Sequence, residues 1–479
     1  MEKKEYFSYS KKLKEEIVKN KNKNYEKAMA AIAAYAKMSY NWNQFYTDDE
    51  IEKTVCELSD AMFGYTSNEK TCANDDSVMF YDGFGLDTRG LAAIYAKALV
   101  QLGYKIIWIT TDKSKGKIPM IEGFLKQGDA EIVYLDIDNS YTRHVKELNE
   151  QFKKYKPAQA FFYTTPDDVS AEIVFYHYRN RVKRYQINLT DHAYWLGINA
   201  FDYCIEFRDY GAGISRVQRK IPLEKIVLLP FYPLIDRSVT FQGFPFDTIG
   251  RKILFSGGSL YKTIGGGNKF YQIVEEVLKD NEDTIFLYAG SGDDSELKKL
   301  ASKFVNRVQH IQERKDLFAL MEHVDVYLNT YPMLGGLMTQ YSAMAGKPPL
   351  ILNDSGKQDS SGFLIEQESA GVEFDSVRDV VNEINHLLND KEYRSRRAEE
   401  IKKRVISEAE FTSNLSEIMN GEARSRYAEC PDTEEFRHEY LGRFSKKMIA
   451  DSIVRKKNKA ILTRFPKLTM AKVMNKLKH

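Results

Sequence analysis

The sequence contains little cysteine and proline and has no long apolar run. Its four cysteines (Cys56, Cys72, Cys204 and Cys430) are scattered through 479 residues without a CxxC spacing. This pattern argues against a zinc ribbon or a disulfide framework and favours a reducing compartment. No stretch approaches the ~18 consecutive apolar residues of a membrane-spanning helix, and the start, MEKKEYFSYSKKLKEE, lacks the apolar core of a signal peptide. We therefore expect a cytoplasmic protein.

Acidic residues are scarce in the last part of the chain. Residues 441–479 contain twelve Lys or Arg and one acid, Asp451, although the whole chain carries 70 bases and 68 acids. Phe, Ile, Leu, Val and Met are interspersed among these bases, a pattern typical of an interfacial helix on anionic lipid. We predict peripheral contact of residues 441–479 with the inner face of the cell membrane; a cationic, partly ordered tail is the alternative. No stacking platform or RNA-module signature is present, so no nucleic-acid partner is expected.

The remaining composition is that of an ordinary globular protein. Hydrophobic residues make up 43% and charged residues 29% of the chain, which excludes disordered and collagen-like classes. The length suggests two or three domains.

Strands and helices alternate in two successive series. Before the first series, residues 1–75 are expected to form an N-terminal helical segment. Short apolar runs such as KIIWITT and AFFYTT, separated by helix-length intervals, predict a parallel α/β domain over residues 76–235. The segment FYPLIDRSVTFQGFPFDTIGR breaks the rhythm with two prolines and is interpreted as a hinge. A second α/β domain is predicted over 236–425, followed by C-terminal helices and the basic tail over 426–479.

Three loops of the second series are candidate ligand-binding loops, because each follows a strand. In the first, Ser256, Gly257 and Gly258 let the backbone approach a ligand, and Lys262 can meet a phosphate. The alternative is a glycine-rich turn with a solvated lysine.

The other two loops follow later strands. Gln312 and Arg314 can line a base pocket, although a polar turn with Arg314 pairing locally is nearly as good an interpretation. Gly335 and Gly336 leave the first amides of the next helix uncovered, and Thr339 adds a hydroxyl one turn later. This predicts a diphosphate seat at a helix N-terminus; a capped, closely packed helix is the alternative.

The segment DVYLNTYPMLGGLMTQYSAMAGKPPLIL resembles the donor-binding half of GT-B glycosyltransferases, particularly O-GlcNAc-transferase-like and related bacterial enzymes. The resemblance is specific over about Lys252 to Asn353 and only architectural over Ser77 to Pro230. It implies two Rossmann-like domains facing across a cleft and a nucleotide-diphosphate sugar as donor substrate, with a UDP-sugar expected. It implies no metal and no permanently bound cofactor.

The resemblance also assigns residues. Lys262, Gly335, Gly336 and Thr339 would hold the diphosphate, and Arg314 would contact the base. Two features depart from the family pattern. Gln340 and Tyr341 stand where relatives place an acid for the ribose, and the E-x7-E pair of many retaining enzymes is absent.

In the first α/β domain, the loop after the first strand supplies Gly83, Gly85, Asp87 and Arg89 as acceptor-side candidates. Its glycines suit close ligand approach, while Asp87 is at least as well explained as a helix cap.

His192 is the candidate catalytic base, because a histidine near its ordinary pKa can remove a proton from an acceptor hydroxyl. A histidine satisfied within the fold is the alternative. Asp191 is adjacent in the sequence, so we expect the two side chains to diverge. Asp136 and Asp138 imitate a metal-binding DxD motif, but we interpret them as a solvated strand end.

Together these observations predict a hexosyl- or N-acetylhexosaminyl-transferase that moves a sugar from a nucleotide-diphosphate sugar to an acceptor hydroxyl. The expected acceptor is a glycan, a lipid-linked molecule or a protein, and the expected role is assembly of a bacterial surface glycan or glycoconjugate. Two alternatives remain. One is a catalytically silent GT-B subunit that binds a glycan or partners an active transferase. The other is a polyol-phosphate transferase of teichoic-acid type, which uses a CDP-linked donor.

Overall fold

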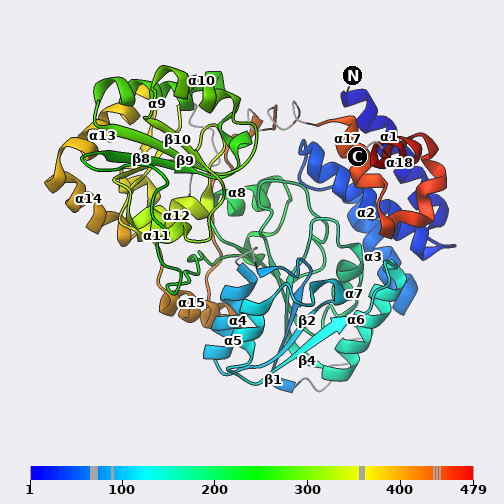
Figure 1. Cartoon of the computed structure of the whole chain (residues 1–479). Coiled ribbons are helices and arrows are strands. Elements are labelled where there is room, and N and C mark those ends of the chain that lie inside the picture. Colours follow the sequence, from blue (N-terminus) through cyan, green and yellow to red (C-terminus); the bar gives the residue numbers. More distant parts are fainter. Residues whose placement is uncertain are drawn as a thin grey trace. The chain divides into compact units, whose positions relative to one another are not determined.

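The computed structural model describes residues 2–64, 74–87, 91–354, 362–434, 437–438, 441 and 444–477. They form two compact units (Figure 1). Unit 1 is drawn from Met1–Leu229 and Thr412–His479, and unit 2 is Pro230–Phe411. The division falls at the start of the proline-rich segment, whose residues 230–251 contain neither helix nor strand.

Unit 1 is built on a parallel sheet with the strand order β3-β2-β1-β4-β5-β6-β7. Its strands are β1 (Asn74–Asp82), β2 (Lys105–Thr111), β3 (Ala130–Leu135), β4 (Pro157–Tyr163), β5 (Lys183–Ile187), β6 (Tyr203–Glu206) and β7 (Ile226–Leu228). Phe80 of β1 lies opposite Trp108 of β2 and Phe161 of β4, and its ring stacks on Trp108 at 4.1 Å between centroids. The continuous apolar runs seen in the sequence are therefore strands buried on both faces.

The helices that connect these strands cover the two faces of the sheet. They are α4 (Leu91–Gln101), α5 (Pro119–Leu125), α6 (Tyr141–Tyr155), α7 (Val169–His177) and α8 (Asp209–Val217). The chain order reverses between β1 and β4, so loops after these strands diverge at the carboxyl edge of the sheet. Such a switch point is where open α/β sheets bind ligands.

The two ends of the chain pack together on unit 1 (Figure 1). The helices involved are α1 (Glu2–Asn20), α2 (Tyr25–Trp42), α3 (Asp49–Phe63), α17 (Lys446–Ile453), the 3-10 segment η7 (Lys456–Arg464) and α18 (Pro466–Leu477). The alanine-rich α2 is central, because it contacts α1, α17 and η7 of the chain ends and also α6 and α7 of the α/β part. Small side chains let these neighbours approach closely, and residues 28–36 of α2 are all buried.

Polar side chains of the C-terminal segment contact α6 and the loop after β4 within unit 1. Tyr141 Oη donates to Asn458 Oδ1 at 2.6 Å, and Lys457 Nζ lies 3.3 Å from His144 Nδ1. Arg455 pairs with Asp167, in the loop after β4. The sequence predicts separate segments over 1–75 and 426–479, whereas the structure places both in unit 1, because only the fold brings the two chain ends together. Among the described helices, none is both long and apolar enough to cross a bilayer.

Unit 2 repeats the architecture with the strand order β10-β9-β8-β11-β12-β13. Its strands are β8 (Lys252–Gly257), β9 (Thr284–Ala289), β10 (Val308–Ile311), β11 (Val326–Leu328), β12 (Pro349–Leu352) and β13 (Glu373–Phe374). Its helices are α9 (Lys269–Asp280), α10 (Ser295–Lys303), α11 (Leu317–Glu322), α12 (Gly336–Met344), α13 (Val377–Asn389) and α14 (Lys391–Lys402), and α15 (Glu408–Asn420) crosses from unit 2 into unit 1. Both sheets thus have the Rossmann order, which confirms the predicted pair of Rossmann-like α/β units.

Candidate active site

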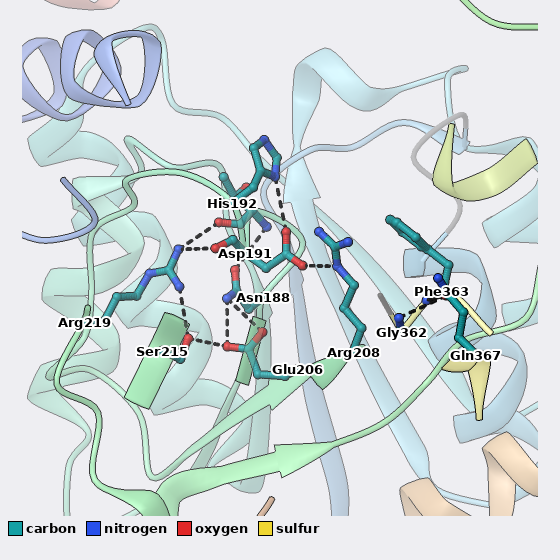
Figure 2. A network of polar contacts seen from close by, with 11 residues as sticks. Asn188, Asp191, His192, Glu206, Arg208, Ser215, Arg219, Gly362, Phe363 and Gln367 are labelled. Atoms are coloured by element: carbon teal, nitrogen blue, oxygen red, sulfur yellow. Dashed lines mark hydrogen bonds and ion pairs between the residues drawn. The ribbon is translucent and has the colours of Figure 1, made fainter. Parts of the chain in front are cut away.

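The loop after β5 carries His192 at the carboxyl edge of the unit 1 sheet (Figure 2). His192 Nδ1 lies 3.2 Å from Asp191 Oδ1, and Arg208 Nε donates to Asp191 Oδ2 at 2.5 Å. Asp191 and Arg208 are buried, while the His192 side chain keeps 26% of its surface exposed. The expectation that Asp191 and His192 diverge was wrong, because the chain turns here and the alternation of side chains that holds in a strand does not apply.

The electrostatics of this trio keep the Asp191 carboxyl ionised beside the imidazole. Burial opposes ionisation of the Asp191 carboxyl, but the Arg208 guanidinium and the His192 ring together hold its pKa well below the usual range. An ionised carboxylate beside Nδ1 fixes the orientation of the ring and stabilises the imidazolium that forms when Nε2 takes a proton. The arrangement is therefore chemically suited to general-base catalysis.

A buried arginine holds the backbone of the same loop (Figure 2). Arg219 Nη2 donates to the carbonyl oxygens of Thr190, Asp191 and Ala193 at 3.1, 2.8 and 2.7 Å. Its Nη1 donates to Ser215 Oγ at 3.1 Å, and this hydroxyl donates to Glu206 Oε1 at 2.5 Å. Burial lowers the pKa of Arg219 and raises that of Glu206. Glu206 lies in β6, Ser215 lies in α8 and Arg219 follows the end of α8, so the sheet and this helix set the position of His192.

The loop after β1 has a mainly structural geometry where it is described. Gly85 has φ +59°, and a Cβ there would lie 1.8 Å from Ser114 Oγ, so close packing requires the glycine. A Cβ on Gly83 would lie 3.1 Å from Asp168 Oδ2. Asp87 accepts the amides of Met120 and Ile121 and so caps α5. Arg89 lies outside the described residues.

In unit 2, the loops after β8 and β11 come together. Lys262 Nζ donates to the carbonyl oxygen of Leu334 at 3.0 Å, and the amide of Met333 donates to the Lys262 carbonyl at 3.2 Å. The Lys262 ammonium is therefore held beside the glycine-rich start of α12. On the β8 loop, Gly258 has φ +127° with open space where a Cβ would stand.

Ser256 and Gly257 form the end of β8. Ser256 is fully buried, and its hydroxyl has no hydrogen-bond partner within the described part of the chain. A Cβ on Gly257 would lie 3.2 Å from the Ala289 carbonyl oxygen. These two residues pack the strand end beneath the loop.

Asn329 organises the start of α12. Its Oδ1 accepts the amides of Thr330 and Gly335 at 2.9 and 3.0 Å, and its Nδ2 donates to Thr339 Oγ1 at 2.7 Å. Thr339 is fully buried, so its hydroxyl serves this internal network. At Gly336 a Cβ would lie 2.2 Å from the ring of Phe363, which leaves no room for a side chain.

The three other donor-side candidates differ in their surroundings. Gln340 is 3% exposed, and its Nε2 donates to the carbonyl oxygen of Phe231 at 2.7 Å. Gln312 is exposed. Arg314 forms a two-pronged ion pair with Asp316 and donates to the carbonyl of Gly243 at 2.7 Å. The local pairing of Arg314 is the alternative that the sequence left open.

Within the described residues, no group of three or more His, Cys, Asp or Glu is placed to hold a metal ion. Asp136 of the DxD-like segment instead pairs with Arg143 at 2.5 Å.

Sequence reasoning missed three residues that shape these loops: Arg208, Arg219 and Asn329. Asn329 had a signal, as a polar residue between a buried strand and a glycine-rich helix start. Arg208 follows the strand YCIEF, but nothing in its neighbours indicates that it meets Asp191. Arg219 carries no local signal for its contact with this loop, because the carbonyl groups that it binds there lie more than twenty residues earlier in the chain.

The chain resembles known proteins in its sequence and in its fold. Residues 250–390 match the family model of the glycosyl transferases group 1. No curated protein sequence matches the chain.

Solved structures resemble both units. An O-GlcNAc transferase mutant from Thermobaculum terrenum is 14% identical over 88% of this chain and 78% of its own, with a TM-score of 0.55. A glycosyltransferase from Rickettsia africae is 15% identical over 73% of this chain and 98% of its own, with a TM-score of 0.53. The UDP-GlcNAc 2-epimerase from Neisseria meningitidis bound to UDP-GlcNAc is 14% identical over 72% of this chain and 100% of its own, with a TM-score of 0.51. These likenesses confirm the predicted GT-B fold.

Proposed function

We propose that the chain, which has the GT-B fold and matches the glycosyl transferases group 1 model over residues 250–390, is a glycosyltransferase that transfers a sugar from a UDP-sugar, bound by unit 2, to a hydroxyl of an acceptor bound by unit 1. The product would be a bacterial surface glycan or glycoconjugate. The observation that carries the proposal is the Lys262 ammonium beside the glycine-rich start of α12.

The chemistry of this unit 2 site suits a diphosphate. The first amides of α12 are not covered by a side-chain cap, because Gly335 occupies the cap position. Their partial positive charge and the Lys262 ammonium attract the same anion. In the transition state, charge develops on the departing nucleoside diphosphate, so both groups would stabilise it where it forms. The structurally similar UDP-GlcNAc 2-epimerase supports UDP as the nucleotide.

The proposed acceptor chemistry belongs to unit 1. His192, oriented by the ionised Asp191, would take the proton of the acceptor hydroxyl as that oxygen attacks the sugar carbon. The carbon–oxygen bond to the diphosphate breaks in the same step, and the nucleoside diphosphate leaves.

The first experiment is thermal unfolding of the full chain with UDP, TDP, GDP, ADP and CDP. A nucleotide at one hundred times its dissociation constant adds about 2.7 kcal/mol of stability. We expect stabilisation by UDP that is lost in Lys262→Met and retained in Lys299→Met, an exposed lysine of α10 in the same unit. Selective stabilisation by CDP would instead indicate a polyol-phosphate transferase. No stabilisation by any nucleotide would indicate a catalytically silent subunit and contradict the proposal.

A second proposal concerns the cationic surface of unit 1. We propose that this surface contacts an anionic membrane. In the C-terminal segment, Lys447, Lys456, Lys459 and Lys467 are exposed. The acids of α1 pair with other bases of this segment, as Glu5 does with Lys446. The support for the proposal is the positive charge of the exposed lysines. Each base contributes about 1 kcal/mol of attraction near anionic lipid.

The neighbouring surface of α1 adds apolar groups. A groove of about 770 Å³ runs beside this helix and is lined by Phe7, Lys11, Val18 and Lys19 among others. Phe7 and Val18 are 54% and 60% exposed. Co-sedimentation with vesicles containing phosphatidylglycerol tests the proposal. Binding should fall when Lys456 and Lys459 are both changed to Glu, and equal binding to neutral vesicles would contradict it.

A further inference from the structure

A buried carboxyl group of the N-terminal helices reaches the loop that carries His192. Both oxygens of Glu52, in α3, accept the amide of Gly197, at 3.1 and 3.2 Å. The two residues are 145 positions apart in the sequence, and Glu52 is 1% exposed. No other described acceptor is recorded for this amide, and a buried amide without a partner is strongly unfavourable. The Glu52 carboxyl thus takes the place of a backbone acceptor.

Gly197 cannot move toward its other neighbour. It has φ +108°, and a Cβ there would lie 2.1 Å from Glu172 Oε2 of α7. The adjacent amide of Leu196 donates to the Pro166 carbonyl at 3.1 Å, and the amide of Ala200 donates to the Gly197 carbonyl at 2.9 Å. The backbone around Gly197 is therefore enclosed between α3 and α7.

The helix that supplies Glu52 is itself fixed to unit 1. Ser59, two turns further along α3, donates its hydroxyl to the Ile173 carbonyl of α7 at 2.7 Å, and both partners are buried. At the start of the helix, Asp48 caps the amides of Glu50 and Ile51. The Glu52 carboxyl is consequently presented from a rigid element.

The His192 loop, residues 188–198, is thus held at two places. Arg219 fixes the carbonyl groups of residues 190, 191 and 193 from the side of α8, and Glu52 fixes Gly197 from the side of α3. His192 lies beside the first anchor and before the second. We propose that Glu52 is a positioning residue, which sets the backbone of the His192 loop from the N-terminal helical segment. Its link to turnover rests on the proposed role of His192.

According to this proposal, the N-terminal helices position the His192 loop in addition to covering the sheet. Burial raises the pKa of Glu52 to about 8, although the amides of Gly197 and Ile198 lower it. At neutral pH the Glu52 carboxyl is therefore mostly uncharged. An uncharged acceptor is favourable here because the neighbouring Glu172 is also a buried carboxyl, and burial raises the pKa of Glu172 well above the usual range.

The test compares three variants of the full chain. Glu52→Leu removes both acceptor oxygens at similar volume, and Glu52→Gln keeps one. Ser59→Ala is the matched control, since it removes another buried α3 hydrogen bond without touching the loop. Deuterium exchange of peptides covering residues 188–200 is measured by mass spectrometry. We expect exchange about tenfold faster in Glu52→Leu, and rates near those of the unchanged protein in Glu52→Gln and Ser59→Ala.

Wild-type exchange in Glu52→Leu would overturn the positioning role, whatever His192 does. Equal acceleration in Ser59→Ala would also overturn it, because the effect would then be general loosening of α3. Should Glu52→Leu not fold, Glu52→Asp replaces it, because the shorter side chain withdraws the carboxyl from Gly197.

Kinetics then separate this inference from the proposed function. In Glu52→Leu we expect a lower kcat with an unchanged donor KM, and rescue in Glu52→Gln. Faster exchange with unchanged kcat would leave the anchor established and refute its link to turnover, whereas the base role of His192 is tested by His192→Ala.

Discussion

Glu52→Gln should change how the stability of unit 1 depends on pH. The pKa of Glu52 is raised by burial from 4.5 to about 8. The folded state therefore holds this proton more tightly than the unfolded state, so the stabilisation is complete below pH 4.5 and is lost as the pH rises toward 8. Each pKa unit corresponds to 1.36 kcal/mol. The loss is thus about 2 kcal/mol at pH 6 and about 4 kcal/mol at pH 8.

Glutamine has no proton to lose, so the variant lacks this dependence. The difference in unfolding free energy between Glu52→Gln and the unchanged protein should shift in favour of the variant by about 2 kcal/mol from pH 6 to pH 8. The other titratable groups recorded around Glu52 are common to both proteins; they are Asp48, Asp49, Cys56, Glu172 and Tyr194.

Urea denaturation followed by tryptophan fluorescence measures this difference. The three tryptophans of the chain, Trp42, Trp108 and Trp195, all belong to unit 1, so the signal reports the unit that contains Glu52. A difference that stays constant between pH 6 and pH 8 would refute the reasoning, because Glu52 would then ionise alike in the folded and unfolded states.

Three further predictions follow from the packing and the site. His192→Ala should lower kcat by roughly 100- to 10,000-fold in steady-state kinetics, with UDP stabilisation unchanged because the proposed nucleotide site lies in unit 2; full turnover would disprove the base role. Gly85→Ala should lower the unfolding free energy of unit 1 by about 2–4 kcal/mol in urea denaturation, because the added methyl group meets Ser114. Gly103→Ala, whose methyl group meets only open space, should lower it by about 1 kcal/mol. Equal losses in the two variants would contradict the packing argument. Arg455→Met should destabilise by about 1–3 kcal/mol, since it strips the buried Asp167 of its partner, while the exposed Arg464→Met should lose less than about 1 kcal/mol.

Local pattern was sufficient for the strands and for the loops that carry the donor-side candidates. A parallel strand buried on both faces is a continuous apolar run, and the loop that follows it needs glycine where the backbone turns. Lys262, Gly335 and Gly336 could therefore be selected from their place in the sequence alone. Their contact through Leu334 could not, since it joins loops from two separate strands.

Residues that hold the candidate base were less accessible to sequence reasoning. Asp191 and His192 are neighbours in the chain, yet whether their side chains meet depends on a turn and on Arg208, which follows a different strand. The role of Thr339 was likewise undecided, because a hydroxyl at a helix start can face a ligand or, as here, an internal asparagine.

The sequence by itself determined the two α/β series, the glycine-rich loops and the uneven distribution of charge, because each arises from neighbouring residues and their periodicity. Only the tertiary structure decided that both chain ends form one helical layer on unit 1 and that Glu52 reaches Gly197. Those contacts join residues far apart in the chain, where burial and the need to satisfy every enclosed polar group select the partner.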